Sequence, residues 1–246
     1  MSGFETIIYE KRNNIAYITL NRPDVLNIYN IQMRDDLHEI LSAVRDDGEV
    51  KAAILMGAGE KAFCGGADLS EFLSAPSPII ARRVRWDRDV WGLFLDIPQP
   101  VIASLHGYTL GSGIEMALCC DIRIASDDAR FGLPEVGLGI IPAAGGTQTL
   151  PRTIGQARSL EMLLSNHWLG AEEAYRYGLV NKVTARKDLI PAAEKIAGKI
   201  ASLDPIAVRN AKRAVAKGLD LDLAKGLDLE KRLAGVVRSE DSLSDH

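Results

Sequence analysis

The sequence predicts an α/β protein built from repeated β-β-α units, with a helical region at its C-terminus. Three observations carry this prediction. The 246-residue chain is long enough to bury a substantial core. Its first part follows a strand–strand–helix order that returns roughly every 40–50 residues, which favours stacked β-β-α turns over a simple β-α-β alternation. From about Leu189 onward the pattern is helical.

The first predicted elements are two short strands, a helix and a buried strand. Residues 4–10 and 15–20 favour β-structure and are separated by a short polar segment, which predicts a hairpin. Asn30 is placed to cap a helix that runs to about Arg45, because apolar side chains recur there at helical spacing. The apolar run at 52–56 predicts a compact buried strand.

The middle of the chain alternates between glycine-rich turns and apolar segments. A polar, glycine-rich loop extends to Asp68, and a proline-containing break then leads into an arginine-rich helix that ends near Leu95. Residues 101–105 favour a strand, residues 107–113 a turn that opens a helix, and residues 122–124 a third buried strand.

The C-terminal helices begin with recognisable capping residues. Asp204 followed by Pro205 is typical of an N-cap and the first helical position. We expect residues 1–190 to form the core and residues 191–246 a helical layer over that core or over a neighbouring subunit.

Composition excludes several classes of function. The formal net charge of −4 gives no general attraction to nucleic acid or to an anionic membrane. The cysteines are Cys64, Cys119 and Cys120, which do not suggest a disulfide framework, and the histidines show no metal-ligand spacing. Neither a signal peptide nor a membrane span is visible, so we expect a cytoplasmic protein without a metal site.

Two glycine-rich loops, each after a strand and before a helix, are candidate ligand sites. In the loop at 62–69, the N–H of Ala67 is free to donate outward if Asp68 begins the next helix. In the loop at 106–115, Ser112 lies at a helix start, where backbone N–H groups have no partner within the helix. Two such donors converging on one point form an oxyanion hole. Glycine turns after strands are also common as simple chain reversals.

Two glutamates lie in unusually apolar surroundings. Glu115 falls about one turn into a helix whose neighbouring residues are apolar, and Glu135 follows Pro134 within apolar and glycine residues. Either could simply be an acidic residue that interacts with a helix dipole. They are too far apart in sequence to share a helix face, so only the fold can bring them together.

Taken together, these residues resemble the crotonase superfamily, which contains the enoyl-CoA hydratases and isomerases. The similarity extends from about residue 5 to residue 240, in order and with the expected spacings. The segments that carry it are 21–27, 62–69, 106–115, 120–125, 131–139, 141–148 and, later, 171–174 with 178–180.

This resemblance implies a fold, an assembly and a substrate. The fold is a crotonase-like spiral of β-β-α turns whose C-terminal helical region serves oligomerisation and covers the active site. The assembly is a homotrimer or a homohexamer. The substrate is an acyl-CoA thioester whose oxygen lies between the N–H groups of Ala67 and Ser112. Coenzyme A is then part of the substrate, and no separate cofactor is implied.

The resemblance also assigns roles to individual residues. Glu115 helps to activate a water for attack at C3, and Glu135 exchanges a proton with C2. Since hydratases of this family have both glutamates, their presence favours hydration of a 2-enoyl-CoA. Burial in an apolar pocket would raise the pKa of Glu135 and suit it to proton transfer. The residues expected to bind substrate are Asp24, Val25, Leu26, Gly65, Gly66, Asp68, Leu69 and Gly111.

Some positions depart from the family pattern. Ser112 stands where glycine is usual, and Ala143 and Thr149 replace the glycine and arginine common in hydratases. The chain also lacks the usual aromatic and basic tail that often helps to bind coenzyme A. The basic segment 82–88 offers contacts to phosphates, although a solvated helix face is the ordinary interpretation, and Trp86 and Trp91 are equally consistent with an acyl pocket and with helix packing.

Two alternatives to a hydratase stay open at this point. The first is an enoyl-CoA isomerase, or another specialised acyl-CoA lyase or hydrolase with the same fold. The second is a non-catalytic or RNA-binding protein on a crotonase scaffold. The acidic balance argues against RNA, and the presence of both glutamates argues against a loss of catalysis.

Overall fold

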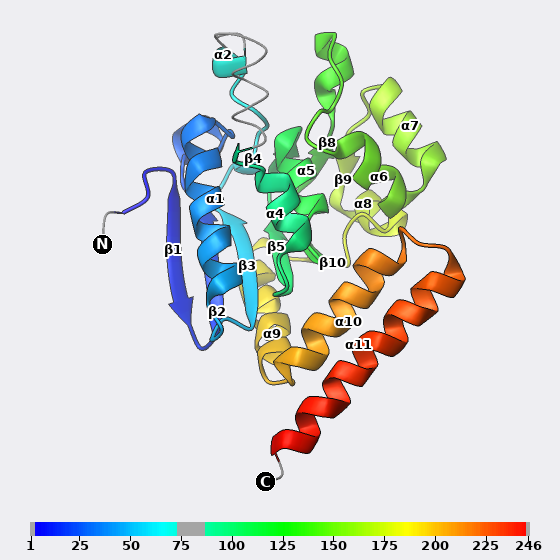
Figure 1. Ribbon diagram of the computed structural model, residues 1–246. Helices are drawn as coiled ribbons and strands as arrows, with labels where there is room; N and C mark the ends of the chain where they lie inside the picture. Colours follow the sequence, from blue (N-terminus) through cyan, green and yellow to red (C-terminus); the bar gives the residue numbers. More distant parts are fainter. Residues whose placement is uncertain (1–2, 73–86, 245–246) are drawn as a thin grey trace.

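Two β-sheets form the centre of the protein (Figure 1). The computed structural model describes residues 3–72 and 87–244, and every structural statement below concerns this part of the chain. The larger sheet has the strand order β1-β2-β3-β5-β7-β10 and is parallel except for the β1–β2 hairpin. Its strands are β1 (Ile7–Arg12), β2 (Ile15–Leu20), β3 (Ala52–Gly57), β5 (Val101–Leu105), β7 (Ile122–Ser126) and β10 (Lys182–Thr184).

A smaller sheet of short strands lies beside the larger one and has the order β4-β6-β8-β9. The β4–β6 and β6–β8 pairs are parallel, whereas β8 and β9 are antiparallel. Its strands are β4 (Ala62–Cys64), β6 (Tyr108–Leu110), β8 (Arg130–Gly132) and β9 (Leu169–Gly170).

The order of strands and helices produces a spiral. Three times in succession, a strand of the larger sheet is followed by a strand of the smaller sheet and then by a helical segment: β3-β4-α2, β5-β6-α5 and β7-β8-η2. The helices concerned are α2 (Leu69–Phe72), α5 (Ser112–Leu118) and the 3-10 helix η2 (Pro134–Leu138). This arrangement confirms the predicted β-β-α turns and the α/β fold class.

Helices cover both faces of the larger sheet. On one face, α1 (Ile31–Asp46) and α4 (Val90–Asp96) pack on alternate strand residues such as Leu55 and Ala103. On the other face, α9 (Leu189–Ala201) packs on residues such as Ile54 and Ile102. Successive side chains of a strand point to opposite faces, so the continuous apolar strands of the sequence are buried on both sides.

Several local predictions are confirmed at the atomic level. The Asn30 side chain accepts a hydrogen bond from the Met33 N–H at 2.9 Å and so caps α1. Asp204 accepts from the Ala207 N–H at 2.7 Å and caps α10 (Pro205–Gly218) in the same way.

Other local predictions need correction. Strand β1 begins at Ile7 and continues to Arg12, because Asn13 and Asn14 alone make the turn, with φ angles of 51° and 63°. Strands β4 and β6 lie in segments predicted to be loop and turn. Each has only three residues, too few to show a strand periodicity in the sequence.

The segments between η2 and β10, and after α9, are mainly helical. They contain α6 (Gly146–Ile154), α7 (Gln156–Leu164), α8 (Ala171–Tyr177), the 3-10 helix η3 (Arg186–Asp188), α10 and α11 (Leu223–Ser244). Helices α10 and α11 form an antiparallel hairpin at one side of the molecule (Figure 1). Among the described residues, no helix is both long and apolar enough to cross a membrane.

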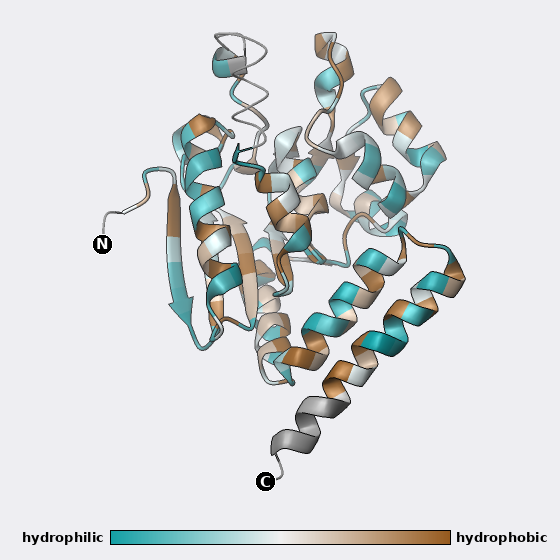
Figure 2. Cartoon of the chain, viewed as in Figure 1, coloured by the Kyte–Doolittle hydropathy of each residue, from teal (hydrophilic) through white to brown (hydrophobic). Residues whose placement is uncertain are grey.

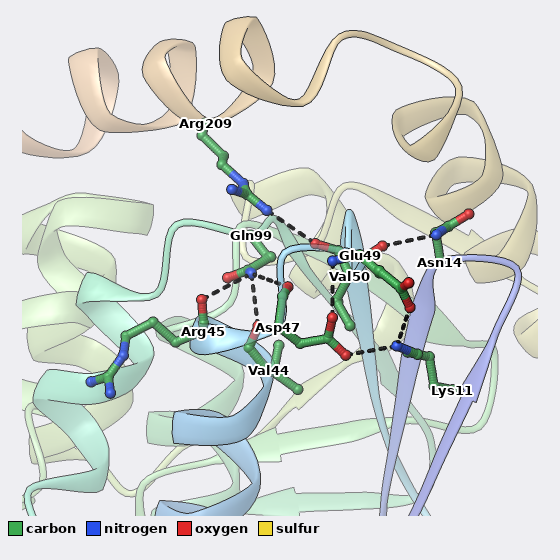
Figure 3. A network of polar contacts seen from close by, with 9 residues as sticks. All are labelled: Lys11, Asn14, Val44, Arg45, Asp47, Glu49, Val50, Gln99 and Arg209. Atoms are coloured by element: carbon green, nitrogen blue, oxygen red, sulfur yellow. Dashed lines mark hydrogen bonds and ion pairs between the residues drawn. The ribbon is translucent and has the colours of Figure 1, made fainter.

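Polar contacts attach α10 to the amino end of the larger sheet. Arg209 donates to the Val50 carbonyl at 3.2 Å, and Lys212 donates to the Gln99 carbonyl at 2.9 Å and to Asp121 at 2.7 Å. The buried Gln99 amide donates in turn to the carbonyl of Val44 at 2.7 Å, within the network in Figure 3. The hairpin itself alternates between polar and apolar residues (Figure 2).

Candidate active site

The first candidate loop follows β4, and its backbone is fixed by a short bridge to Tyr29. The Tyr29 N–H donates to the Gly66 carbonyl at 2.8 Å, and the Asp68 N–H donates to the Tyr29 carbonyl at 2.8 Å. Consecutive N–H groups of an extended chain point in opposite directions. The N–H of Ala67, between Gly66 and Asp68, therefore points away from Tyr29 and is available for a ligand.

The second candidate loop joins β6 to α5. Gly111 is the N-cap residue of α5, with φ 51° and ψ −123°, a conformation that favours glycine. Its own N–H donates to the Gly132 carbonyl at 2.9 Å. Ser112 is the first residue of α5 and is 8% exposed, and an N–H at this position has no acceptor within its helix.

The two loops meet at their glycines. A Cβ atom placed on Gly111 would lie 3.5 Å from the Gly66 Cα and 3.0 Å from the Glu135 Oε1. Glycine is therefore needed at position 111, where a side chain would intrude between the other loop and a carboxylate. The fold thus brings Gly66, Gly111 and Glu135 to one place, although they come from three successive turns of the spiral.

Glu115 reaches the same region from inside α5. Its side chain is only 2% exposed. Its Oε1 accepts hydrogen bonds from the N–H of Ala144 at 3.0 Å and of Gly146 at 2.8 Å, the latter being the first residue of α6. Two backbone donors therefore fix the orientation of this carboxylate, which a buried acidic group needs.

Glu135 lies in η2, directly after Pro134, and its local setting differs from that of Glu115. Its Oε2 is buried and has no hydrogen-bond partner among the described residues. Burial raises the pKa of Glu135 to about 7, and the nearby charge of Glu115 adds to the increase, while a backbone hydrogen bond opposes it. Near neutral pH, Glu135 can therefore both hold and release a proton.

The expected substrate-binding residues surround the first loop. Leu26 lies against Gly65, whose N–H donates to the Leu26 carbonyl at 2.8 Å. Asp68 is hydrogen-bonded to Ser70, which lowers the pKa of Asp68, and its carboxylate lies 3.6 Å from Arg22. The remaining three side chains are exposed to solvent; they are Asp24, Val25 and Leu69.

The other departures from the family pattern have simple local outcomes. The Thr149 hydroxyl donates to the Gly145 carbonyl at 3.0 Å, one turn back in its own helix. The Trp91 ring packs against Tyr29 at 5.6 Å between centroids, so packing is its observed role. Arg88 pairs with Glu39 at 2.9 Å. The rest of the basic segment up to Trp86 lies outside the described residues.

Sequence reasoning gave no role to the residues that orient this site. The backbone donors of Ala144 and Gly146 were unpredictable, because nothing local connects them to Glu115. Asn27 was also missed, although a polar residue that tolerates a left-handed backbone, within the segment 21–27, is a recognisable signal.

Comparison with known proteins agrees with this geometry. Residues 10–245 match the enoyl-CoA hydratase/isomerase family. A putative enoyl-CoA hydratase/isomerase, YngF of Bacillus subtilis, is 44% identical over 94% of this chain and 88% of its own length. The crotonyl-CoA hydratase of Syntrophomonas wolfei is 40% identical over 95% of this chain and 90% of its own length.

Solved structures give the same result. The crystal structure of an enoyl-CoA hydratase from Bacillus anthracis superposes with a TM-score of 0.91 at 40% identity, covering 97% of this chain and 93% of the other. An enoyl-CoA hydratase structure from Geobacillus kaustophilus superposes with a TM-score of 0.90 at 36% identity, covering 97% and 91%. On its fold, its converging loops and these similarities, the chain belongs to the enoyl-CoA hydratase/isomerase family of the crotonase superfamily.

Proposed function

We propose that this protein is an enoyl-CoA hydratase that adds water across the 2,3 double bond of an acyl-CoA thioester. The observation that carries the proposal is the pairing of two unlike carboxyl groups. Glu115 is oriented by two backbone donors, whereas Glu135 has an unpartnered oxygen and a pKa of about 7. Relatives named crotonyl-CoA hydratase and short-chain-enoyl-CoA hydratase, both 40% identical, support it.

The thioester oxygen would bind between the N–H groups of Ala67 and Ser112. Attack at C3 pushes electrons through the conjugated system onto this oxygen and produces an enolate. Backbone donors that already point at the position of the developing charge stabilise that state more than the ground state. The close approach of Gly66 and Gly111 leaves room for the thioester between the loops.

The two glutamates would divide the acid and base work. Glu115 accepts a hydrogen bond or a proton from the water whose oxygen bonds to C3. Glu135, in its protonated form, gives a proton to C2 as the enolate collapses back to a thioester. This division follows from their surroundings, since a carboxyl group with a raised pKa is the better acid near neutral pH. Coenzyme A is part of the substrate, and the scheme uses no metal or redox cofactor.

We also propose that the protein assembles as a homotrimer or homohexamer in the cytoplasm and binds neither nucleic acid nor membranes. The support for assembly is apolar surface at the end of the C-terminal hairpin, where Leu219 is 82% and Leu223 is 78% exposed. The support against nucleic acid is the net charge of −4.

Substitution of Glu135 by glutamine tests the proposed chemistry. This variant keeps the size of the side chain and cannot transfer a proton, so we expect hydration of crotonyl-CoA to fall by about 10²–10⁴-fold. Acyl-CoA affinity, measured by calorimetry with butyryl-CoA, should be nearly unchanged. Glu172→Gln, at an exposed position of α8, is the matched control and should behave like the wild type.

Three results would contradict the proposal. Unchanged turnover in Glu135→Gln would remove its role in proton transfer. Double-bond migration in a 3-enoyl-CoA, without hydration of any 2-enoyl-CoA, would identify an isomerase. Salt-dependent RNA binding without turnover of any enoyl-CoA would identify a non-catalytic member of the superfamily.

A further inference from the structure

The segment from Arg22 to Tyr29 lies along the loop that carries the Ala67 N–H. The contacts of this segment with the loop are all made by main-chain atoms, through the Leu26 carbonyl to Gly65 and through both polar groups of Tyr29. The direction of the Ala67 N–H therefore depends on the conformation of a segment about forty residues earlier in the chain.

Asn27 connects this segment to the surrounding strands. Its side chain is completely buried. The Nδ2 group donates to the carbonyl of Ala58 at 2.9 Å and to the carbonyl of Ala62 at 2.9 Å, while the Oδ1 accepts from the Arg22 N–H at 2.8 Å. A single amide thus joins the 22–29 segment, the end of β3 and the start of β4.

The backbone at Asn27 also requires support. Leu26 and Asn27 both have positive φ angles, 58° and 54°. Asparagine tolerates this conformation, whereas leucine rarely adopts it. Such a conformation persists only where the surrounding contacts determine it, and the three hydrogen bonds of the Asn27 amide are such contacts.

We propose that Asn27 is a positioning residue for the oxyanion hole: its buried amide holds the 22–29 segment so that the Ala67 N–H points at the thioester oxygen. The inference rests on the proposed function and extends it to a residue that contacts no substrate. If the segment shifts, Leu26 and Tyr29 move the loop at 65–68 with them. The lost interaction is one made in the transition state, so kcat should respond more than KM.

Asn27→Asp and Gln99→Glu form a matched pair of variants. Both replace a buried amide that donates to main-chain carbonyls, but Gln99 lies at the amino end of the larger sheet, where it bonds to Val44 (Figure 3). With crotonyl-CoA, we expect Asn27→Asp to lower kcat by about 10–100-fold and to change KM by less than about threefold. Gln99→Glu should lower the melting temperature and leave kcat within about twofold of the wild type.

Asn27→Gly separates positioning from folding. Glycine accepts the positive φ angle, so this variant removes the amide and keeps the backbone conformation accessible. We expect the same loss of kcat at a temperature where circular dichroism shows a folded protein. The alkaline decrease in kcat/KM near pH 7 should stay in place, because Glu135 keeps its surroundings.

Hydrogen exchange gives a readout that does not depend on turnover. Amides of residues 64–68 should exchange faster in Asn27→Gly and at the wild-type rate in Gln99→Glu. Wild-type kcat in a folded Asn27→Gly, an equal loss in Gln99→Glu, or unchanged exchange would each overturn the positioning role. If the wild type hydrates no enoyl-CoA, the proposed function fails, and the exchange rates still decide whether Asn27 orders the loop.

Discussion

Glu135 owes its chemistry to its surroundings rather than to its residue type. An exposed glutamate is ionised near neutral pH, whereas burial and the charge of Glu115 raise the pKa of Glu135 to about 7. The sequence showed an apolar neighbourhood and so predicted an increase. It could not show the second carboxylate, because the 20 positions between the two glutamates span β7 and β8.

The raised pKa predicts the pH dependence of hydration. Protonated Glu135 is the form that donates to C2, so kcat/KM should be lost as pH rises through about 7, by about tenfold per unit above it. Initial rates with crotonyl-CoA between pH 5.5 and 9.5 measure this (a range chosen to bracket that pKa, about two units either way). A value of kcat/KM that rises through pH 7 would show that the ionised form is the active one.

The contribution of Glu115 can be measured on Glu135 directly. In Glu115→Gln a like charge is removed, so the pKa of Glu135 should fall. It should stay above the ordinary value of 4.5, because burial is the larger cause of the increase. Titration of the labelled carboxyl carbon by NMR measures both proteins. An unchanged pKa would indicate that the two carboxyl groups do not interact.

At the scale of elements, the start of α5 shows what the sequence predicts and what it leaves out. Glycine-rich residues after a strand correctly indicated a turn into a helix. The contact of this turn with β4 was not predictable, because strands as short as β4 and β6 leave no periodic signal. Yet this contact fixes the position of Ser112 relative to the first loop.

Gly113 makes the contact and provides its test. A Cβ on Gly113 would lie 2.3 Å from the Cys64 carbonyl oxygen, so Gly113→Ala must displace α5 from β4. We expect a loss of about 1–3 kcal/mol in unfolding free energy, together with reduced turnover. Gly198→Ala, in α9 with open space around the position, should instead stabilise the protein by about 0.5–1 kcal/mol. Urea unfolding measures both, and equal stability of the two variants would contradict the close packing.

At the scale of the whole molecule, the spiral turns a repeated local order into one site. Each turn ends at the same side of the sheets, so the loops after β4, β6 and β8 supply Ala67, Ser112 and Glu135 in succession. The repeat of strand, strand and helix was visible in the sequence, and the fold class followed from it. The attachment of α10 through Arg209 and Lys212 was not visible, because it uses main-chain acceptors.

The apolar end of the C-terminal hairpin predicts a defined oligomer. With a chain mass of 26.7 kDa, sedimentation equilibrium should give about 80 kDa for a trimer or about 160 kDa for a hexamer. Replacing Leu219 and Leu223 by glutamate should reduce that mass if these side chains lie in the interface, because charged groups there would be buried without partners. A mass of one chain at micromolar concentration would contradict the assembly.

The position of a bound thioester tests the account most directly. A crystal structure with a slowly reacting enoyl-CoA analogue should place the thioester oxygen at about 2.7–3.1 Å from both the Ala67 and Ser112 nitrogens. The Glu115 and Glu135 carboxyl groups should lie over the C2–C3 bond. A thioester bound elsewhere, or an oxygen in contact with neither N–H group, would contradict the proposed site.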